Sequence, residues 1–225
     1  VPIENSLEGA VTDTLDLLIR ESTLFIRAEL VLAISHCLLV VPGTLGKDIT
    51  VIYSHPQALA QCRAFLERTF PTAQVVASLS TVSAVEEMQN SKQTAAAIAP
   101  RRAAELYESE IIGEGLQDSD VNVTRFVVLG GTDHEPTGRD KTSLCFSFEK
   151  DRPGSLYKVV GEFAERHINL VKIESRPTKE GLGSYIFLID LDGHKEDPKV
   201  KEALEVIQKD VSMLRIFGSY PSFAQ

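Results

Sequence analysis

The sequence predicts a mixed α/β protein in two parts, and three observations lead to this prediction. Apolar residues recur with the period of strands in some stretches and with the period of helices in others. Residues 131–141, GTDHEPTGRDK, contain no apolar residue and are rich in turn formers, so they are expected to be a linker. Strands and helices alternate before this linker, whereas the element order after it is βαββαβ.

The first part, residues 1–130, is expected to contain one self-sufficient lobe at residues 30–110 and the remainder of a second lobe in the flanks. Within the flanks, Val1–Ile3 and Val123–Leu129 are apolar enough to be central strands, yet neither has an obvious partner strand nearby. The other expected elements are a helix at 14–19, strands at 29–41 and 49–53, a helix from His55-Pro56 to about Leu66, a strand at 74–77, a helix at 81–89, a strand at 94–99 and a helix at 101–109.

The second part, residues 142–225, is expected to be a ferredoxin-like unit. Leu144, Phe146 and Phe148 share one face of a half-buried strand at 142–149. Gly154-Ser155 starts a helix whose apolar residues recur at helical spacing. The remaining elements are strands at 168–173, 184–191 and 213–220, a hairpin loop at 176–183, and a helix that starts at Pro198 with Asp197 as its N-cap.

Composition excludes several classes of protein. The net charge of −9 argues against a surface for nucleic acid or anionic membranes. The longest apolar run, Leu30–Pro42, is broken by Ser35 and His36 and is too short to span a bilayer. The three cysteines are scattered and the five histidines lack ligand spacing, which predicts reduced thiols in a cytoplasmic protein and no metal site.

Polar signals in the first part lie mostly where a strand gives way to a helix. They are IENS at 3–6, SHPQ at 54–57, STVS at 80–83 and NVTRF at 122–126. Ligands of open α/β sheets bind beyond the carboxyl ends of strands, where helix N-termini favour carboxylates. Ser54, Thr81 and Ser83 could add hydroxyl donors, which predicts a site for a small acid. The alternative for each residue alone is a helix cap, and for Arg125 an ion pair with Glu4.

Several common chemistries lack their motifs. GEG at 113–115 lacks the rest of a phosphate-binding loop, and there is no G-x-S-x-G nucleophile elbow. The sequence therefore favours a cofactor-free reaction on a small acid, with a binding protein as the alternative. In the second part, N–H groups at Gly154–Leu156 could take a carboxylate and Glu174 an ammonium group, which suits an amino acid. An ordinary loop is the alternative there.

These same residues resemble one known family. VPIENS, YSHPQAL, STVSA and NVTRFVVLG, followed by PGSLYKVV and INLVKIESRP, resemble the motifs of prephenate dehydratase, in order and over essentially the whole chain. The resemblance implies a two-lobed α/β catalytic domain like the type 2 periplasmic binding proteins, followed by a ferredoxin-like ACT domain. It implies conversion of prephenate to phenylpyruvate with loss of water and carbon dioxide, no cofactor, feedback by phenylalanine at the ACT domain, and a homodimer or homotetramer.

The resemblance also implies roles for particular residues. The essential threonine of the family falls on Thr124, which would donate to the departing ring hydroxyl while Asn5 and Gln61 fix the ring. Other catalytic or substrate-binding positions fall on Glu4, Ser54, Thr81, Arg125 and Phe126. The phenylalanine-binding motifs fall on Gly154, Ser155, Leu156 and Tyr157, where many members have Ala in place of Ser155, and on Glu174, Ser175, Arg176 and Pro177.

One departure from the family concerns the stretch before VPIENS. Family members carry a glycine-rich strand–helix–strand–helix segment there, which would line one wall of the cleft and is not in this sequence. We therefore expect these 225 residues alone to have little dehydratase activity, while the ACT domain could still fold, dimerise and bind phenylalanine. Two alternatives remain: a phenylalanine sensor whose catalytic half has decayed, and a dehydratase that prefers arogenate.

Overall fold

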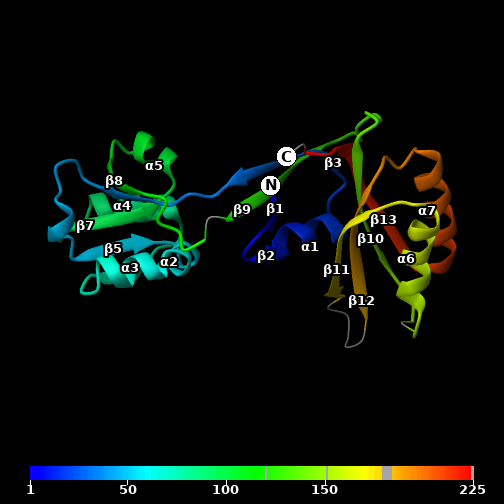
Figure 1. Cartoon of the computed structure of the whole chain (residues 1–225), viewed down its shortest axis with the longest axis horizontal. Coiled ribbons are helices and arrows are strands. Elements are labelled where there is room, and N and C mark those ends of the chain that lie inside the picture. The colour runs from blue at the N-terminus through cyan, green and yellow to red at the C-terminus, as the bar shows by residue number, and fades with distance from the viewer. Residues whose placement is uncertain (120, 151, 179–183, 224–225) are drawn as a thin grey trace. The chain divides into compact units, whose positions relative to one another are not determined.

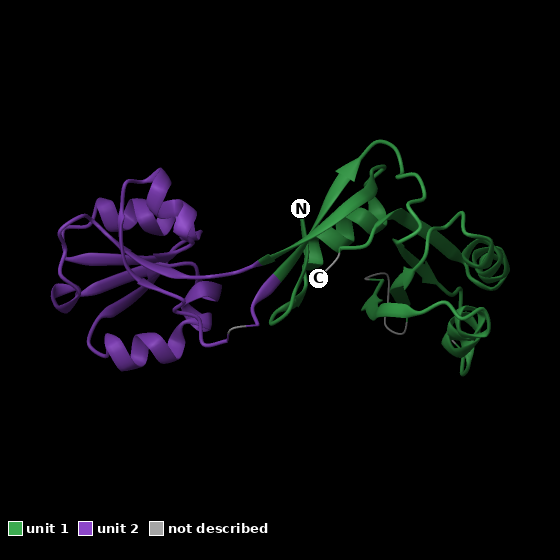
Figure 2. Ribbon diagram, turned by 45° about the horizontal axis from the view of Figure 1, so that its top comes forward, with its two compact units in different colours: residues 1–32, 124–225 green, residues 33–123 purple. Residues whose placement is uncertain are grey.

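The computed structural model describes residues 1–119, 121–150, 152–178 and 184–223. The chain divides into two compact units (Figures 1 and 2). Unit 1 comprises Val1–Leu32 together with Thr124–Gln225, and unit 2 comprises Ala33–Val123. Within the described residues, no helix is both long and apolar enough to cross a membrane.

Unit 2 is a five-stranded sheet with helices on both faces. The strand order is β6-β5-β7-β4-β8; β5 runs parallel to β6 and β7, whereas β4 is antiparallel to β7 and β8. Its strands are β4 (Cys37–Val40), β5 (Val51–Ser54), β6 (Gln74–Ala77), β7 (Ala95–Ala99) and β8 (Glu110–Glu114). Its helices are η1 (Gly46–Asp48), α2 (Pro56–Gln61), α3 (Arg63–Thr69), α4 (Thr81–Gln89) and α5 (Arg101–Leu106).

The central strand β7 separates two cores in unit 2. Ala95 and Ala97 face the cluster that contains α4 and α5, whereas Ala96 and Ile98 face the cluster that contains α2 and α3. This alternation is the period of two that a strand imposes on its side chains. Because all five residues of β7 are buried, the strand reads as a continuous apolar run in the sequence.

The single strand expected at 29–41 is wrong, because the structure has two strands there. β3 (Phe25–Ala33) belongs mainly to unit 1, and β4 begins at Cys37 in unit 2. Between them the chain is held by other partners: Ile34 N–H donates to the Asn122 carbonyl, and His36 N–H donates to Gln117 Oε1. The helix expected from Pro56 to Leu66 is likewise interrupted, at Cys62, and β8 was not expected.

The N-terminal sheet of unit 1 has the strand order β2-β1-β9-β3. It consists of β1 (Pro2–Asn5), β2 (Gly9–Ala10), β3 and β9 (Val123–Gly130), and α1 (Thr12–Arg20) packs beside it. The two apolar strands that lacked partners in the sequence are each other's partner: β1 and β9 pair antiparallel, with Glu4 opposite Arg125 and Asn5 opposite Thr124. No local pattern could reveal a pairing between segments so far apart in the chain.

The C-terminal sheet of unit 1 confirms the expected βαββαβ unit. Its four antiparallel strands have the order β11-β12-β10-β13 of a ferredoxin-like fold. The elements are β10 (Asp140–Ser147), α6 (Ser155–Glu165), β11 (Leu170–Pro177), β12 (Tyr185–Asp192), α7 (Pro198–Asp210) and β13 (Met213–Pro221). β10 begins inside the stretch expected as a linker. Of the expected hairpin loop at 176–183, residues 179–183 lie outside the described residues.

The two faces of the C-terminal sheet have different coverings. Helices α6 and α7 pack on one face, where Phe163 and Ile207 meet Phe146. The other face forms a second core with α1 and the N-terminal sheet, which includes Leu18, Val127 and residues of β10, β12 and β13. The N-terminal and C-terminal sheets of unit 1 are therefore parts of one packed body.

Candidate functional site

The Thr124 hydroxyl and the Asn5 amide form a buried pair on the β1–β9 ladder. Asn5 Nδ2 donates to Thr124 Oγ1 at 2.9 Å, and the two residues are 8% and 9% exposed. Asn5 Oδ1 accepts from the backbone N–H groups of Leu7 and Glu8, which fixes the orientation of the amide. Because Thr124 Oγ1 accepts from Asn5, its own hydroxyl hydrogen is left to be donated to another group.

Gln61, in unit 2, belongs to a second polar cluster. Its Oε1 lies 2.9 Å from Asn122 Nδ2 and 2.9 Å from His36 Nε2, and both partners are buried. With Gln61 Oε1 as the acceptor, His36 carries its proton on Nε2. Sequence reasoning did not select His36 or Asn122. Asn122 stands in the NVTRF motif, and His36 is the polar interruption of the longest apolar run, so each left a signal.

Ser83 follows the helix-cap alternative that the sequence left open, whereas Ser54 does not, because the N-cap of α2 is His55. Ser54 Oγ donates to the Ile98 carbonyl at 2.6 Å and is fully buried. Ser83 completes a capping box with Ser80 at the start of α4. Thr81 is the first residue of that helix and is half-buried. A hydroxyl already donated to a carbonyl, as in Ser54, would have to rotate before it could donate to a ligand.

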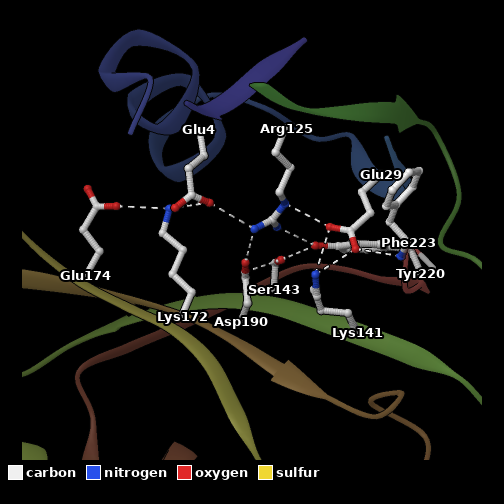
Figure 3. Close-up of polar contacts among 10 residues, drawn as sticks. All are labelled: Glu4, Glu29, Arg125, Lys141, Ser143, Lys172, Glu174, Asp190, Tyr220 and Phe223. Carbon is white, nitrogen blue, oxygen red and sulfur yellow. Dashed lines mark hydrogen bonds and ion pairs between the residues drawn. The ribbon is translucent and has the colours of Figure 1, made fainter. Parts of the chain in front are cut away.

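A buried ion-pair network surrounds Arg125 in unit 1 (Figure 3). Arg125 Nη1 lies 2.6 Å from Asp190 Oδ2 and 3.3 Å from Glu4 Oε2, and Nη2 donates to the Tyr220 hydroxyl at 3.1 Å. Arg125 Nε is 2.9 Å from Glu29 Oε2, an ion pair without hydrogen-bond alignment. Burial alone would lower the pKa of Arg125, but Asp190, Tyr220 and Glu29 raise it above its ordinary value, so the guanidinium stays charged.

The network continues into the C-terminal sheet. Lys141 Nζ lies 2.7 Å from Glu29 Oε1, and Ser143 Oγ donates to Asp190 Oδ1 at 2.5 Å. Ser143 Oγ is also 2.6 Å from the Tyr220 hydroxyl. Burial, reinforced by Asp190, raises the pKa of Tyr220, so its phenol stays protonated and remains a donor. Glu29 and Asp190 are charged residues inside apolar strands, a signal of buried pairing that sequence reasoning did not use.

Lys172 connects Glu4 to one of the predicted effector residues. Its Nζ lies 3.3 Å from Glu4 Oε2 and 3.3 Å from Glu174 Oε2. Glu4 and Arg125 thus form the ion pair that the sequence offered as an alternative, within a larger network. Successive side chains of a strand point to opposite faces. Glu4 and Arg125 therefore point away from the side of the ladder that carries the Thr124 hydroxyl.

The predicted phenylalanine-binding segments lie at one end of the C-terminal sheet. Ile186 of β12 is opposite Ser147 at the end of β10 and also opposite Arg176 near the end of β11. Gly154 caps the N-terminus of α6 with a φ of +89°, and Tyr157 is 79% exposed. Of the other residues predicted for this site, Ser155 and Leu156 begin α6, and Glu174, Ser175 and Pro177 lie in β11. The predicted substrate residue Phe126 lies on β9, opposite Pro2 of β1.

Arg176 is held by α1 through its guanidinium. Its Nη2 lies 3.0 Å from Asp16 Oδ1, and its Nη1 donates to the Thr12 carbonyl at 3.4 Å. Its neighbour Glu174 also faces the N-terminal elements, through Lys172. The structure therefore places the two charged residues of this segment on the face of β11 that packs against the N-terminal part of unit 1.

Comparison with known proteins decides the family. A prephenate dehydratase family model matches residues 1–134, and an ACT domain model matches residues 149–208. The chain belongs to the prephenate dehydratase family. The resemblance noted in the motifs is thus confirmed, as is the expected fold of a periplasmic-binding-protein-like α/β domain followed by an ACT domain.

Relatives of this prephenate dehydratase family member include two curated bacterial and archaeal proteins. The chain is 42% identical over 221 residues to a bifunctional chorismate mutase/prephenate dehydratase of Aquifex aeolicus, covering 98% of this chain and 60% of that protein. It is 40% identical over 227 residues to a prephenate dehydratase of Methanocaldococcus jannaschii, covering 99% of this chain and 80% of that protein. The chain therefore spans about 60% of the length of the first of these curated relatives.

A solved structure supports the same assignment. The prephenate dehydratase of Arthrobacter aurescens in complex with L-phenylalanine superposes with a TM-score of 0.89 at 37% sequence identity. The match covers 99% of this chain and 74% of the other.

Proposed function

We propose that this chain provides catalytic and regulatory parts of a prephenate dehydratase, which converts prephenate to phenylpyruvate with loss of water and carbon dioxide. The observation that carries the proposal is the buried Thr124 hydroxyl, held by Asn5 at 2.9 Å with its proton available for donation. Membership of the dehydratase family supports it. We propose further that residues 1–130 are the dehydratase part and residues 142–225 the ACT domain, joined by residues 131–141; the separate family matches support this division.

The chemistry requires little more than a positioned proton donor. The ring hydroxyl of prephenate leaves more easily when a donor protonates its oxygen or donates a hydrogen bond to it. Aromatisation of the ring then drives the loss of carbon dioxide. Thr124 would donate to that oxygen, with Asn5 fixing the threonine hydroxyl. A positioned donor of this kind contributes roughly 10²–10⁴-fold in rate. Gln61, Ser54 and Thr81 remain predicted substrate contacts.

The central prediction concerns the Thr124 hydroxyl. In the complete gene product, Thr124→Val should lower kcat by roughly 10²–10⁴-fold and leave KM for prephenate nearly unchanged, because the lost interaction acts mainly in the transition state. Thr124→Ser keeps the hydroxyl and should retain most of kcat. The measurement is steady-state formation of phenylpyruvate.

A matched control separates this role from general damage to the fold. Thr142 is also a buried threonine in unit 1, with its hydroxyl 2.7 Å from the Gly193 carbonyl. Thr142→Val should lower stability while kcat is retained. If Thr124→Val raised KM and left kcat intact, Thr124 would be a binding residue and the proposed donor role would be wrong.

We also propose that phenylalanine is a feedback inhibitor bound at Gly154–Tyr157 and Glu174–Pro177. The N-terminus of α6, which has no side-chain cap within the described residues, suits its carboxylate, and the Glu174 carboxylate suits its ammonium group. A homodimer or homotetramer is proposed with it. The edge strand β11 supports this assembly, because it leaves Val171 and Ile173 45% and 50% exposed.

Two other functions have specific predictions of their own. A phenylalanine sensor with a decayed catalytic half would bind phenylalanine but form no phenylpyruvate, and the retained Asn5–Thr124 pair argues against it. An arogenate dehydratase would turn over arogenate better than prephenate, so kcat/KM for the two substrates decides between them.

We propose a cytoplasmic location as well; the three free, buried cysteines support it, since thiols persist in reducing compartments.

A further inference from the structure

The Asn5–Thr124 pair and the Glu4–Arg125 pair lie on the same two strands, one step apart. In the β1–β9 ladder Asn5 is opposite Thr124 and Glu4 is opposite Arg125. Neighbouring side chains of a strand point to opposite faces, so the ion pair lies behind the proposed catalytic pair. A change in the position of the Glu4–Arg125 pair that shifts the β1–β9 backbone therefore also moves the Asn5–Thr124 pair.

The ion pair is anchored on the C-terminal sheet (Figure 3). Asp190 of β12 contacts Arg125 at 2.6 Å, and Tyr220 of β13 accepts from Arg125 at 3.1 Å. The side chains of Arg125 and Asp190 are 14% and 9% exposed, so their interaction is little screened by water. Strand β9, which carries Thr124, is thus held in place by groups of the ACT domain.

Lys172 extends this anchoring to the proposed effector segment. Its ammonium group is shared between Glu4 and Glu174, at 3.3 Å from each carboxylate. A ligand ammonium group paired with Glu174 competes with Lys172 for that carboxylate. Lys172 then interacts more with Glu4, and Glu4 interacts less with Arg125. Occupancy at Glu174 therefore changes the charge balance directly behind Thr124.

We propose that Glu4 and Arg125 are positioning residues for the Asn5–Thr124 pair, and that Lys172 couples them to ligand occupancy at Glu174. The coupling rests on the proposed dehydratase function and its regulation by phenylalanine. Arg125 acts through the ladder from behind Thr124, in contrast to the substrate-binding role that the resemblance implied for it. The structure contributes what the motifs do not contain, namely a continuous set of contacts from the ACT strand β11 to the catalytic strand β9.

A kinetic experiment on the complete gene product separates positioning from substrate binding. Arg125→Lys keeps the charge but loses the fork that contacts Asp190, Glu29 and Tyr220 together. We expect kcat to fall by about 10–100-fold with KM for prephenate changed by less than about 3-fold. Tyr220→Phe removes one hydroxyl at nearly constant shape and should give a smaller loss of kcat with the same unchanged KM. A raised KM with intact kcat in both variants would overturn the positioning role.

A second experiment tests the link through Lys172, again in the complete gene product. In Lys172→Met, calorimetry should give a Kd for phenylalanine equal to or up to about 3-fold lower than that of the parent, because the competing ammonium group is gone, while saturating phenylalanine no longer changes kcat by more than about 2-fold. The control is Lys195→Met, which removes a lysine paired with Asp133 outside this network and should keep the parent's inhibition.

Each remaining outcome has a defined meaning. Inhibition that persists unchanged in Lys172→Met overturns the coupling. Loss of phenylalanine binding in that variant assigns Lys172 to the effector site and also overturns it. A parent enzyme that does not bind phenylalanine refutes the proposed regulation, and with it the link through Lys172. A parent that binds phenylalanine but forms no phenylpyruvate refutes the dehydratase function itself.

Discussion

At the scale of single residues, Arg125 lies among the carboxylates of Glu4, Glu29 and Asp190. Each of these charges would be costly to bury alone, and removing one partner leaves the others uncompensated. The sequence indicated Glu4 as a partner. It did not indicate Glu29 or Asp190, because a charge in an apolar strand signals that a partner exists without saying where in the chain that partner is.

Asp133 and Asp140, which lie before and at the start of β10 in unit 1, make the stability of the protein depend on pH. Asp133 pairs with Lys195 and accepts from the Ser219 N–H, and Asp140 accepts from Thr137 and Gly138. Burial raises the pKa of both carboxyls, but the hydrogen bonds outweigh it and hold both pKa values below the ordinary range. A depressed pKa contributes stability that is present above about pH 4 and lost as pH falls through the folded-state value.

Asp133→Asn should therefore weaken this acid sensitivity. At pH 7 we expect a loss of about 1–2 kcal/mol in the free energy of unfolding, and the difference from the parent should shrink below about pH 4. Urea unfolding of the variant and the parent at pH 7 and pH 3 measures this difference in the free energy of unfolding. Glu135→Gln, at an exposed carboxylate nearby, serves as the control and should change neither value. A constant difference between Asp133→Asn and the parent at both pH values would contradict the prediction.

At the scale of elements, agreement between sequence and structure follows the strength of local signals. β6 and α4 have the bounds expected from the sequence, because polar punctuation and the Ser80 capping box mark where they start and end. The strand expected at 29–41 failed for a related reason. Ser35 and His36 interrupt the apolar run, and in the structure the backbone N–H groups of Ile34 and His36 donate to Asn122 and Gln117 in place of a strand ladder, close to the boundary between the two units.

Gly218 of β13 is required by the close packing of two strands. A Cβ at this position would lie 2.3 Å from the Ile26 carbonyl oxygen and 2.8 Å from the Ile26 nitrogen, both backbone atoms of β3. Gly218→Ala should therefore lower the free energy of unfolding by roughly 2–5 kcal/mol, since the strands must separate or strain. Chemical denaturation, followed by circular dichroism, measures the change.

The control for Gly218 is another glycine of the same unit. Among the described residues, a Cβ at Gly161 in α6 would meet no atom within 4 Å, so Gly161→Ala should stabilise the protein by roughly 0.5–1 kcal/mol. If both alanine variants were equally stable, the contact between β13 and β3 would not be tight in solution.

At the scale of the whole molecule, the chain forms two units with separate cores. The two clusters of unit 1 draw all their residues from that unit, and the two clusters of unit 2 do likewise. Unit 1 is the less expected of the two. It joins the first thirty-two residues to the ACT domain in one packed body, whereas the linker at 131–141 suggested a boundary there.

Separate cores predict separate responses to a core mutation. Ile98 is fully buried in unit 2, and Ile98→Ala should cost about 2–5 kcal/mol of local stability. Hydrogen exchange should then accelerate at amides of β5 and β7 and stay unchanged in β10 and β12 of unit 1. The reciprocal variant Phe163→Ala should accelerate exchange in unit 1 alone. Equal acceleration in both units would show that they unfold as one cooperative body.

The sequence alone determined the type of most elements, the βαββαβ order and the motifs that indicate the family. Those properties depend on local periodicity, capping and turn chemistry, which neighbouring residues specify together. The tertiary structure decided that β1 pairs with β9, that Arg125 is held by Glu29 and Asp190, and that Lys172 lies between Glu4 and Glu174. These contacts join segments distant in the chain, so they depend on how the sheets pack, which no local pattern records.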